Sequence, residues 1–543
     1  MFYRRTLSIG AAVLGLVVSS FGSQDIIEAA KTGDLAKVRA LVEASPGQVG
    51  AKDQAGRTPL HWACRGVHPE VVEYLVAHGA DVNARDNAGV SPLHSVSSRG
   101  HVQAVKTLIA AGARIEAKMN DQSTPLHLAA AQGHGNLVAL LLEKGAPVDV
   151  RDGKEDTTLH AAAWGERWDV VELIAGELKD RRKTVLDLPD FDGNTVLHLA
   201  AAAGRMQTVK ILAAAGAGLD GRNTLGQSAF NLAEAGGFSE VASWLKEKGV
   251  DRGSHKFPKL AGPYLGQVPP GSEPKLFAKG IVSTRAGLYG TITFSPDGRE
   301  AVWRPESKAG ILYANSLSGT WGPPRVFSPT AREAAVSFPF FSLDGRRVYF
   351  TAGTVGSSGI TEKEIIAFAE KIGEGWSERK AFDSVVNSLN LHWQFSLDET
   401  GNVYFSGPGG INCSRFENGR YLPPAPLPEP INEKHSEEDK YSSGEIGPFI
   451  SPRGDYLIYS RVRAGTPLPF QLFIAFKRDD GSWSEPRNLS EKLRTEGNDS
   501  MAMVTPDGKF LFFQSQRIGS GAARGLYWVD ARVIEDLRPK KEG

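Results

Sequence analysis

A histidine recurs at a fixed interval in the first half of this chain. His61, His94, His127 and His160 follow one another at intervals of 33 residues, and each is the third residue after a Thr or Ser. A constant period of this size indicates a solenoid, in which each repeat packs mainly on its neighbours. The chain length therefore does not set the number of domains in the usual way, and the architecture favours binding over a conventional enzyme core.

The repeat begins with a Thr-Pro-Leu-His sequence or a close variant of it. Related segments lie at residues 58–61, 91–94, 124–127, 157–160 and 195–198, and Asn231 keeps the register once more. The hydroxyl of Thr or Ser caps free amides at the start of a helix, and proline is tolerated at the first helical position. One interval is 38 residues, which we assign to an insertion around residues 177–184.

Together with Gly-Ala-Asp-Val-Asn-Ala at residues 79–84 and Gly133-His134, these copies resemble the ankyrin repeat over residues 24–252. The resemblance implies an all-α solenoid of about seven repeats. Residues 24–53 keep the helical pattern without the Thr-Pro-Leu-His start, as a capping repeat should.

Glycine marks the end of the first helix in four repeats. Gly100, Gly133, Gly204 and Gly237 fall where the chain must adopt a left-handed conformation. The matching positions of two other repeats hold Val67 and Glu166, each with a glycine one residue earlier. We expect those two turns to deviate from the geometry of the others.

The histidines also invite a metal-binding interpretation, because nine of the twelve lie in this region. No Cys or carboxylate recurs beside them at ligand spacing. We therefore interpret the motif histidines as structural groups that tie neighbouring loops together. No metal site and no cofactor is predicted.

Exposed aromatic and basic residues are the candidates for partner binding. Trp62 and Trp164 lie on or just after first helices, which line the concave face in the ankyrin family, and Arg65 and Arg167 stand three residues beyond them. Aromatic and arginine side chains often anchor protein partners. Packing between repeats is the alternative role for the two tryptophans.

The N-terminus resembles a secretory signal. Arg4-Arg5 precede an apolar stretch over residues 7–18, and small residues follow near Gly22. We expect residues 1–23 to be removed, which would leave a periplasmic or secreted protein without a membrane span. An uncleaved anchor is the alternative, although this apolar stretch is shorter than the roughly 20 residues that cross a bilayer.

Charge and cysteine content narrow the classes of partner. The chain has 62 basic and 62 acidic residues, so no global field would attract nucleic acid. We predict protein partners and no nucleic acid. Cys64 and Cys413 lie in different repeat regions, and we expect both to be unpaired.

A Pro- and Gly-rich segment at residues 253–272 is predicted to be a semi-stiff linker. Beyond it, a second repeat is built on turns that follow one strand and precede another, at spacings of 47, 54, 55 and 54 residues. The turns begin at Ser295, Ser342, Ser396, Ser451 and Thr505. Asp-Gly between β-rich segments indicates a hairpin, and we expect positive φ at both of its central positions.

These turns resemble those of TolB-like or WD-repeat-like β-propellers, which implies an all-β propeller at residues 273–543. Each blade ends on a related segment, such as that at residues 483–489, and a further copy at residues 272–277 precedes the first turn. We infer that this early segment closes the last blade, since ring closure protects strand edges. Five blades result. Six is the alternative, because TolB itself is six-bladed.

The propeller offers one set of candidate ligand residues. His392, Glu445 and Asp499 fall just before the innermost strands and would lie at the mouth of the channel, where plain solvated charges are the alternative. The charged segment at residues 435–440 is interpreted as a solvated loop. The sequence lacks a Gly-x-Ser-x-Gly elbow, a His-Glu-x-x-His motif and a phosphate loop, so no catalytic residue is predicted.

Two extended surfaces on one exported chain favour a non-enzymatic scaffold or adaptor for protein partners. The alternative is a propeller-based enzyme or glycan-binding protein that uses the ankyrin repeats as a targeting arm.

Overall fold

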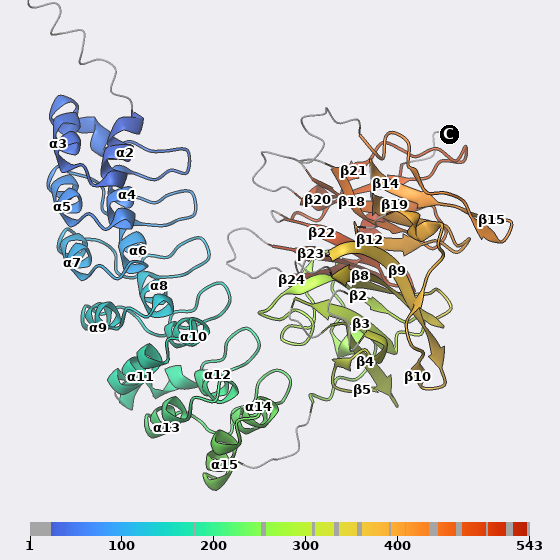
Figure 1. Ribbon diagram of the computed structural model, residues 1–543, viewed down its shortest axis with the longest axis horizontal. Coiled ribbons are helices and arrows are strands. Elements are labelled where there is room, and N and C mark those ends of the chain that lie inside the picture. Colours follow the sequence, from blue (N-terminus) through green and yellow to red (C-terminus); the bar gives the residue numbers. More distant parts are fainter. Residues whose placement is uncertain are drawn as a thin grey trace, which may run out of the picture. The chain divides into compact units, whose positions relative to one another are not determined.

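The computed structural model of the protein has two compact units, a stack of helices and a set of β-sheets (Figure 1). It describes residues 23–539 except 179, 251–256, 307–309, 331–335, 356–360, 390–391, 408, 434–443, 463–469, 496–497 and 517–524. The signal sequence expected at residues 1–23 lies outside this part except for Ser23, which begins the first described helix. None of the described helices is both long and apolar enough to cross a membrane.

Seven helix pairs make up the first unit. The first helices are α2 (Ser23–Thr32), α4 (Pro59–Gly66), α6 (Pro92–Ser97), α8 (Pro125–Gln132), α10 (Thr158–Trp164), α12 (Val196–Ala202) and α14 (Ala229–Ala235). The second helices are α3 (Leu35–Ala44), α5 (Pro69–Ala77), α7 (Val102–Ala110), α9 (Gly135–Glu143), α11 (Trp168–Glu177), α13 (Met206–Ala214) and α15 (Ser239–Glu247). Each row stacks on its own kind, α4 against α6 and α5 against α7, as expected for ankyrin repeats.

The motif histidines are structural, as predicted. Nδ1 of His61 accepts a hydrogen bond from the backbone N–H of Thr58 at 3.1 Å, so its Nε2–H donates to the Val90 carbonyl of the next repeat at 2.9 Å. The same link to a later loop carbonyl is made, at 3.0–3.2 Å, by His94, His127, His160 and His198.

The turns after the first helices correct one expectation. Gly100 and Gly133 have positive φ, as predicted, but Val67 (φ 60°) and Glu166 (φ 59°) adopt the same left-handed conformation. The displaced glycine serves packing instead: a Cβ on Gly165 would lie 2.3 Å from the Ala131 carbonyl oxygen of the preceding repeat. Stacking therefore imposes one turn geometry on residues that do not favour it.

The second unit contains five larger sheets and one small hairpin. The first blade consists of β2 (Leu288–Phe294), β3 (Glu300–Pro305), β4 (Leu312–Leu317), β5 (Thr320–Trp321) and β6 (Arg325–Val326), and the second of β7 (Val336–Phe341), β8 (Arg347–Val355), β9 (Thr361–Ile372), β10 (Gly375–Trp376) and β11 (Lys380–Ala381). The third blade consists of β12 (His392–Leu397), β13 (Val403–Gly407), β14 (Gly410–Ser414) and β17 (Ala425–Pro426), and the fourth of β18 (Gly444–Ile450), β19 (Tyr456–Val462), β20 (Phe470–Phe476) and β21 (Arg487–Asn488). The fifth blade consists of β22 (Ser500–Val504), β23 (Phe510–Ser515), β24 (Gly525–Asp530) and β1 (Lys275–Leu276). The hairpin is β15 (Phe416–Glu417) with β16 (Arg420–Tyr421), and short helices α16 (Leu489–Lys492) and α17 (Arg532–Glu535) complete the unit.

The five sheets form a propeller-like ring of five blades. Their inner strands contact one another in the order β2, β7, β12, β18, β22 and back to β2. The last blade is closed by β1, which precedes the first blade in the sequence and pairs Lys275 with Trp528 of β24. The inferred closure by the segment at residues 272–277 is thus confirmed, and the ring has five blades instead of the alternative six.

The turns between the first two strands of the blades differ in detail from the expected hairpins. The Gly298 N–H donates to the Ser295 carbonyl at 2.8 Å, and Gly298 has φ +67°. Asp297 is not among the residues with positive φ, so only the second residue of the Asp-Gly pair is left-handed. The Asp297 carboxylate instead accepts from the Ser295 hydroxyl at 2.6 Å.

The segment interpreted as a linker contributes to the propeller core. Tyr264 and Leu265, in the short helix η3 (Tyr264–Gly266), are buried, and the Tyr264 hydroxyl donates to Asp507 at 2.6 Å. The Trp321 indole N–H donates to the Gly262 carbonyl at 2.7 Å. These apolar and hydrogen-bonded contacts fix residues that a purely spacing role would leave solvated, which corrects the expectation of a spacer throughout residues 253–272.

Candidate functional site

The first helices present one row of side chains that are exposed or half-buried, except for the buried Leu199. The residues one and four positions after each motif histidine lie three apart and so share a helix face, while the residues between them, such as Ala63 and Ala129, are buried. We call these residues the first-helix surface: Glu28, Lys31, Trp62, Arg65, Ser95, Ser98, Leu128, Ala131, Ala161, Trp164, Leu199, Ala202, Leu232 and Ala235. Three of the four residues predicted to bind a partner belong to it.

Trp62 is half-buried and surrounded by cations. The guanidinium of Arg57 lies 4.2 Å from the centroid of its ring, that of Arg65 lies 5.8 Å away, and the Lys31 ammonium 5.5 Å away. The indole N–H donates to the Asp53 carboxylate at 3.1 Å. Cations over an indole face are attracted to its ring electrons, so Trp62 organises a basic cluster as well as packing on the core.

Trp164 lies further along the same surface and is 42% exposed. The residues in register with it on the two neighbouring first helices are Ala131 and Ala202. Both of these side chains are much smaller than the indole. Of the two tryptophans considered as anchors, Trp164 is the more available to a partner.

The two arginines have different surroundings. Arg65 is exposed, and within the described structure its guanidinium makes no hydrogen bond or ion pair and lies near the Trp62 ring. Arg167 precedes α11, and its aliphatic stem lies over Gly133. A Cβ added at Gly133 would lie 2.7 Å from the Arg167 Cδ. Arg167 thus packs between repeats in the position that His134 occupies over Gly100.

The predicted propeller residues lie at the start of three inner strands, and two of them are buried instead of solvated. His392 is the first residue of β12, and its side chain lies outside the described structure. Glu445 is 2% exposed and its carboxylate is 3.2 Å from Nε of Arg461, which is also buried. Asp499 is 0% exposed and accepts from the Thr495 hydroxyl. The charged segment at residues 435–440 is outside the described part of the chain.

Arg461 is the partner that sequence reasoning did not identify. Its second ion pair, at 2.6 Å, is with Glu433, and its guanidinium lies 4.7 Å from the Phe473 ring centroid. The only sequence signal for Arg461 is that it lies two residues after Tyr459 in a strand, so both side chains are on the same face. The arrangement is a buried ion pair that joins two strands of one blade.

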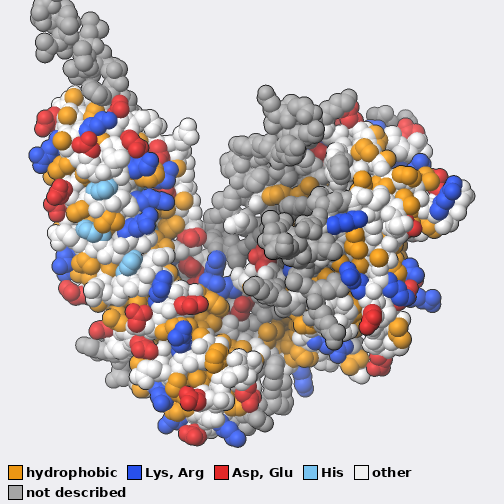
Figure 2. Space-filling model, viewed as in Figure 1, with side chains coloured by type: hydrophobic (Ala, Val, Ile, Leu, Met, Phe, Trp, Pro, Cys, Tyr) orange, Lys and Arg blue, Asp and Glu red, His pale blue; other side chains and the backbone are white. Residues whose placement is uncertain are grey.

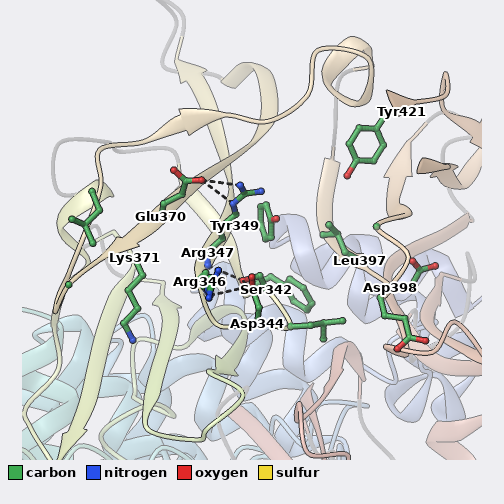
Figure 3. Close-up of a pocket in the computed structure, with 16 residues that line it drawn as sticks. Ser342, Asp344, Arg346, Arg347, Tyr349, Glu370, Lys371, Leu397, Asp398 and Tyr421 are labelled. Atoms are coloured by element: carbon green, nitrogen blue, oxygen red, sulfur yellow. Dashed lines mark hydrogen bonds and ion pairs between the residues drawn. The ribbon is translucent and has the colours of Figure 1, made fainter. Parts of the chain in front are cut away.

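A groove of about 950 Å³ lies between the second and third blades, where their turns meet (Figure 3). Arg347 pairs with Glu370 in this groove at 3.0 Å, and the Asp344 carboxylate accepts a hydrogen bond from the Ser342 hydroxyl at 2.5 Å. Tyr349 and Tyr421 supply aromatic surface. In the part of the chain that the structure describes, no cluster of His, Cys, Asp or Glu could hold a metal ion.

Comparison with known proteins identifies the helical unit. A family model described as ankyrin repeats matches in three copies, at residues 26–119, 115–184 and 159–254. The chain is 44% identical over 54 residues to ankyrin repeat domain-containing protein 40 of Mus musculus, and 49% identical over 49 residues to osteoclast-stimulating factor 1 of Monopterus albus. These matches cover 10% and 9% of this chain, and 15% and 22% of the two relatives. Residues 24–250 therefore consist of ankyrin repeats, a class associated with protein–protein interaction.

Proposed function

We propose that this protein is a non-enzymatic scaffold that holds protein partners on its ankyrin repeats and on its propeller. The observation that carries the proposal is Trp164, an indole 42% exposed in the middle of the first-helix surface and flanked in register by alanines. A large aromatic side chain in such a place offers apolar area to a partner at low cost in conformational entropy. The propeller adds a second rigid body with exposed apolar side chains, of which Ile372 and Leu317 are the most prominent on its strands.

We also propose that the scaffold works outside the cytoplasm and that its propeller is of the TolB-like type. The basic and apolar N-terminal residues support export. The Ser-Pro-Asp-Gly turn at residues 295–298 and its four variants in the other blades support the propeller type. Cell fractionation followed by N-terminal sequencing of the mature chain tests the first part. A mature chain that still begins at Met1 in the cytoplasm would contradict it.

The binding role is tested by crosslinking in the source cells. The tagged full-length protein should enrich a set of partner proteins. The Phe238→Ala variant should enrich the same set, and the Trp164→Ala variant should lose it. Phe238 is a matched control because it is an exposed aromatic, 37% exposed, on the turn before α15 instead of on the first-helix surface. Equal recovery by both variants would remove Trp164 from the binding role, and recovery of no protein by any form would contradict the scaffold.

A further inference from the structure

The first-helix surface changes character along the stack. Its N-terminal part holds charged and polar side chains, Glu28, Lys31, Trp62, Arg65, Ser95 and Ser98. From the fourth repeat onward every member is apolar: Leu128, Ala131, Ala161, Trp164, Leu199, Ala202, Leu232 and Ala235. Figure 2 shows Lys and Arg side chains over the N-terminal repeats, with Asp and Glu side chains among them. A ligand that follows the surface must therefore offer two different chemistries at its two ends.

The N-terminal part carries positive charge that the protein does not neutralise. Around Trp62, Arg57 pairs with Asp53 at 3.0 Å and Lys31 with the exposed Glu28 at 3.2 Å. Arg65 has no hydrogen bond or ion pair within the described structure, and neither has the exposed Arg99 on the next repeat. Guanidinium groups recognise carboxylates through paired hydrogen bonds. This end of the surface fits acidic side chains.

The C-terminal part fits an apolar side chain. Trp164 projects beside Ala131 and Ala202, and the half-buried Leu128 and Ala161 extend the apolar area. No member of the surface in this part is charged, so an acidic group there would lose hydration without gaining an ion pair.

The two ends are three repeats apart. Packed helices lie about 8–10 Å from axis to axis, so Arg65 and Trp164 are roughly 24–30 Å apart along the stack. An extended chain advances about 3.3 Å per residue. A segment of roughly eight or nine residues would therefore reach from one end to the other.

We infer that the first-helix surface binds a protein segment that is acidic at one end and apolar at the other, with the acidic end against Arg65 and the apolar end against Trp164. This inference rests on the proposed scaffold function and specifies its partner. A nucleic acid is disfavoured because it would need basic side chains along its whole path, whereas here they stop before the fourth repeat.

The test is selection from a random peptide library, long enough to span three repeats, on the immobilised full-length protein. Selected peptides should combine acidic residues with a separate aromatic or aliphatic group. Their affinity, measured by calorimetry, should fall roughly tenfold with Arg65→Glu and with Trp164→Ala, and should weaken as sodium chloride is raised. The matched controls Lys246→Glu and Phe238→Ala, both at exposed sites outside the surface, should change it little.

The outcomes separate the two proposals. Neutral or basic peptides that depend on Trp164 but not on Arg65 would overturn the inference and leave the scaffold function standing. Tight binding of single-stranded DNA, lost with Arg65→Glu, would overturn it in favour of a nucleic acid. Absence of any selected peptide that depends on either residue would overturn the inference, and the crosslinking experiment would then decide the scaffold function.

Discussion

Ser91 and His94 exchange hydrogen bonds at the start of α6. The Ser91 backbone N–H donates to Nδ1 of His94 at 3.2 Å, and the His94 backbone N–H donates to the Ser91 hydroxyl oxygen at 3.4 Å. Since Nδ1 is an acceptor, the other ring nitrogen carries the proton and donates to the Ser123 carbonyl at 3.2 Å. A second ring proton would oppose the Ser91 N–H. The fully buried ring thus joins two repeats only in its neutral form.

This geometry predicts that the ankyrin repeats lose stability in acid. Burial lowers the pKa of His94 from 6.5 to about 4, and burial also lowers the pKa of His61 and His127. The unfolded chain therefore binds more protons below pH 6.5, and the stability contributed by His94 falls as pH drops from about 6.5 to about 4. The shift corresponds to roughly 3 kcal/mol. Denaturant unfolding of the helical signal over this pH range measures it.

The chain supplies its own reference for this prediction, because Asn231 occupies the same position in the last repeat. Its side-chain oxygen accepts from the Ser228 N–H at 3.0 Å without a titrating ring. His94→Asn should lower stability at neutral pH and flatten its pH dependence, and Asn231→His should steepen it. Asp152 and Asp190 have the opposite effect on the pH dependence of stability, because burial raises the pKa of each to about 6 and the folded chain then binds more protons. The pH dependence of each variant is therefore compared with that of the parent protein. An unchanged slope in both variants would contradict the prediction.

Val67 should be a site where glycine stabilises the protein. Its φ of 60° and ψ of 49° place a β-branched residue in the left-handed region, which costs about 1–2 kcal/mol for residues with a Cβ. Glycine avoids that cost but is more flexible when unfolded. We expect Val67→Gly to raise the free energy of unfolding by about 1 kcal/mol, measured by denaturant titration.

Gly66→Ala is the control for Val67→Gly. Gly66 has no positive φ, but a Cβ there would lie 2.5 Å from Nε2 of His68. Substitution at this neighbouring glycine should therefore destabilise the protein through lack of space. Stabilisation by both changes would show that the two turns do not differ in the way the structure indicates.

The repeats were predictable because their signals are local and periodic. The Thr or Ser before each histidine caps a helix, and the turn glycines such as Gly298 follow a first strand, so the helix starts, the five blades and the closing strand could be predicted from spacing. Val67 was mispredicted because its neighbours in adjacent repeats, not its own preference, determine its backbone conformation.

The state of the charged residues could not be predicted in the same way. Glu445 and Asp499 lie at the start of inner strands, yet nothing in the sequence around them indicates that Arg461 lies beside Glu445 or that Glu445 and Arg461 are buried. Inner strands also contain register shifts with left-handed residues such as Phe338 and Met501. The register shift recurs in the inner strand of all five described blades, but no glycine marks it in the second and fifth blades, where the left-handed residues are Phe338 and Met501.

The Glu445–Arg461 pair predicts a stability effect that must be separated from any functional one. Losing one member of a buried ion pair costs up to about 3–5 kcal/mol when the remaining charge has no other partner, but after loss of Glu445 the Arg461 guanidinium still pairs with Glu433 at 2.6 Å. Glu445→Leu should therefore destabilise the propeller by less, about 1–3 kcal/mol for a lost buried charge-assisted hydrogen bond, and the double change Glu445→Leu with Arg461→Met should recover much of the loss. Denaturant unfolding followed by tryptophan fluorescence measures both. A single variant as stable as the parent would show that the pair contributes little.

Phe277 should be essential to the closed ring. It follows β1, its backbone N–H donates to the Leu526 carbonyl at 2.8 Å, and its fully buried ring lies 4.9 Å from that of Phe512 and 5.0 Å from that of Trp528. Truncating a buried phenylalanine to alanine costs about 3–5 kcal/mol.

Phe277→Ala should therefore lower propeller stability by that amount and, because β1 is the strand that covers the edge of β24, increase exchange of the backbone amides of β24. Lys275→Ala changes an exposed side chain on the same strand and should alter stability by less than about 0.5 kcal/mol. Hydrogen exchange read residue by residue distinguishes the two changes. If β24 stays protected after Phe277→Ala, the last blade is held closed by contacts other than this strand.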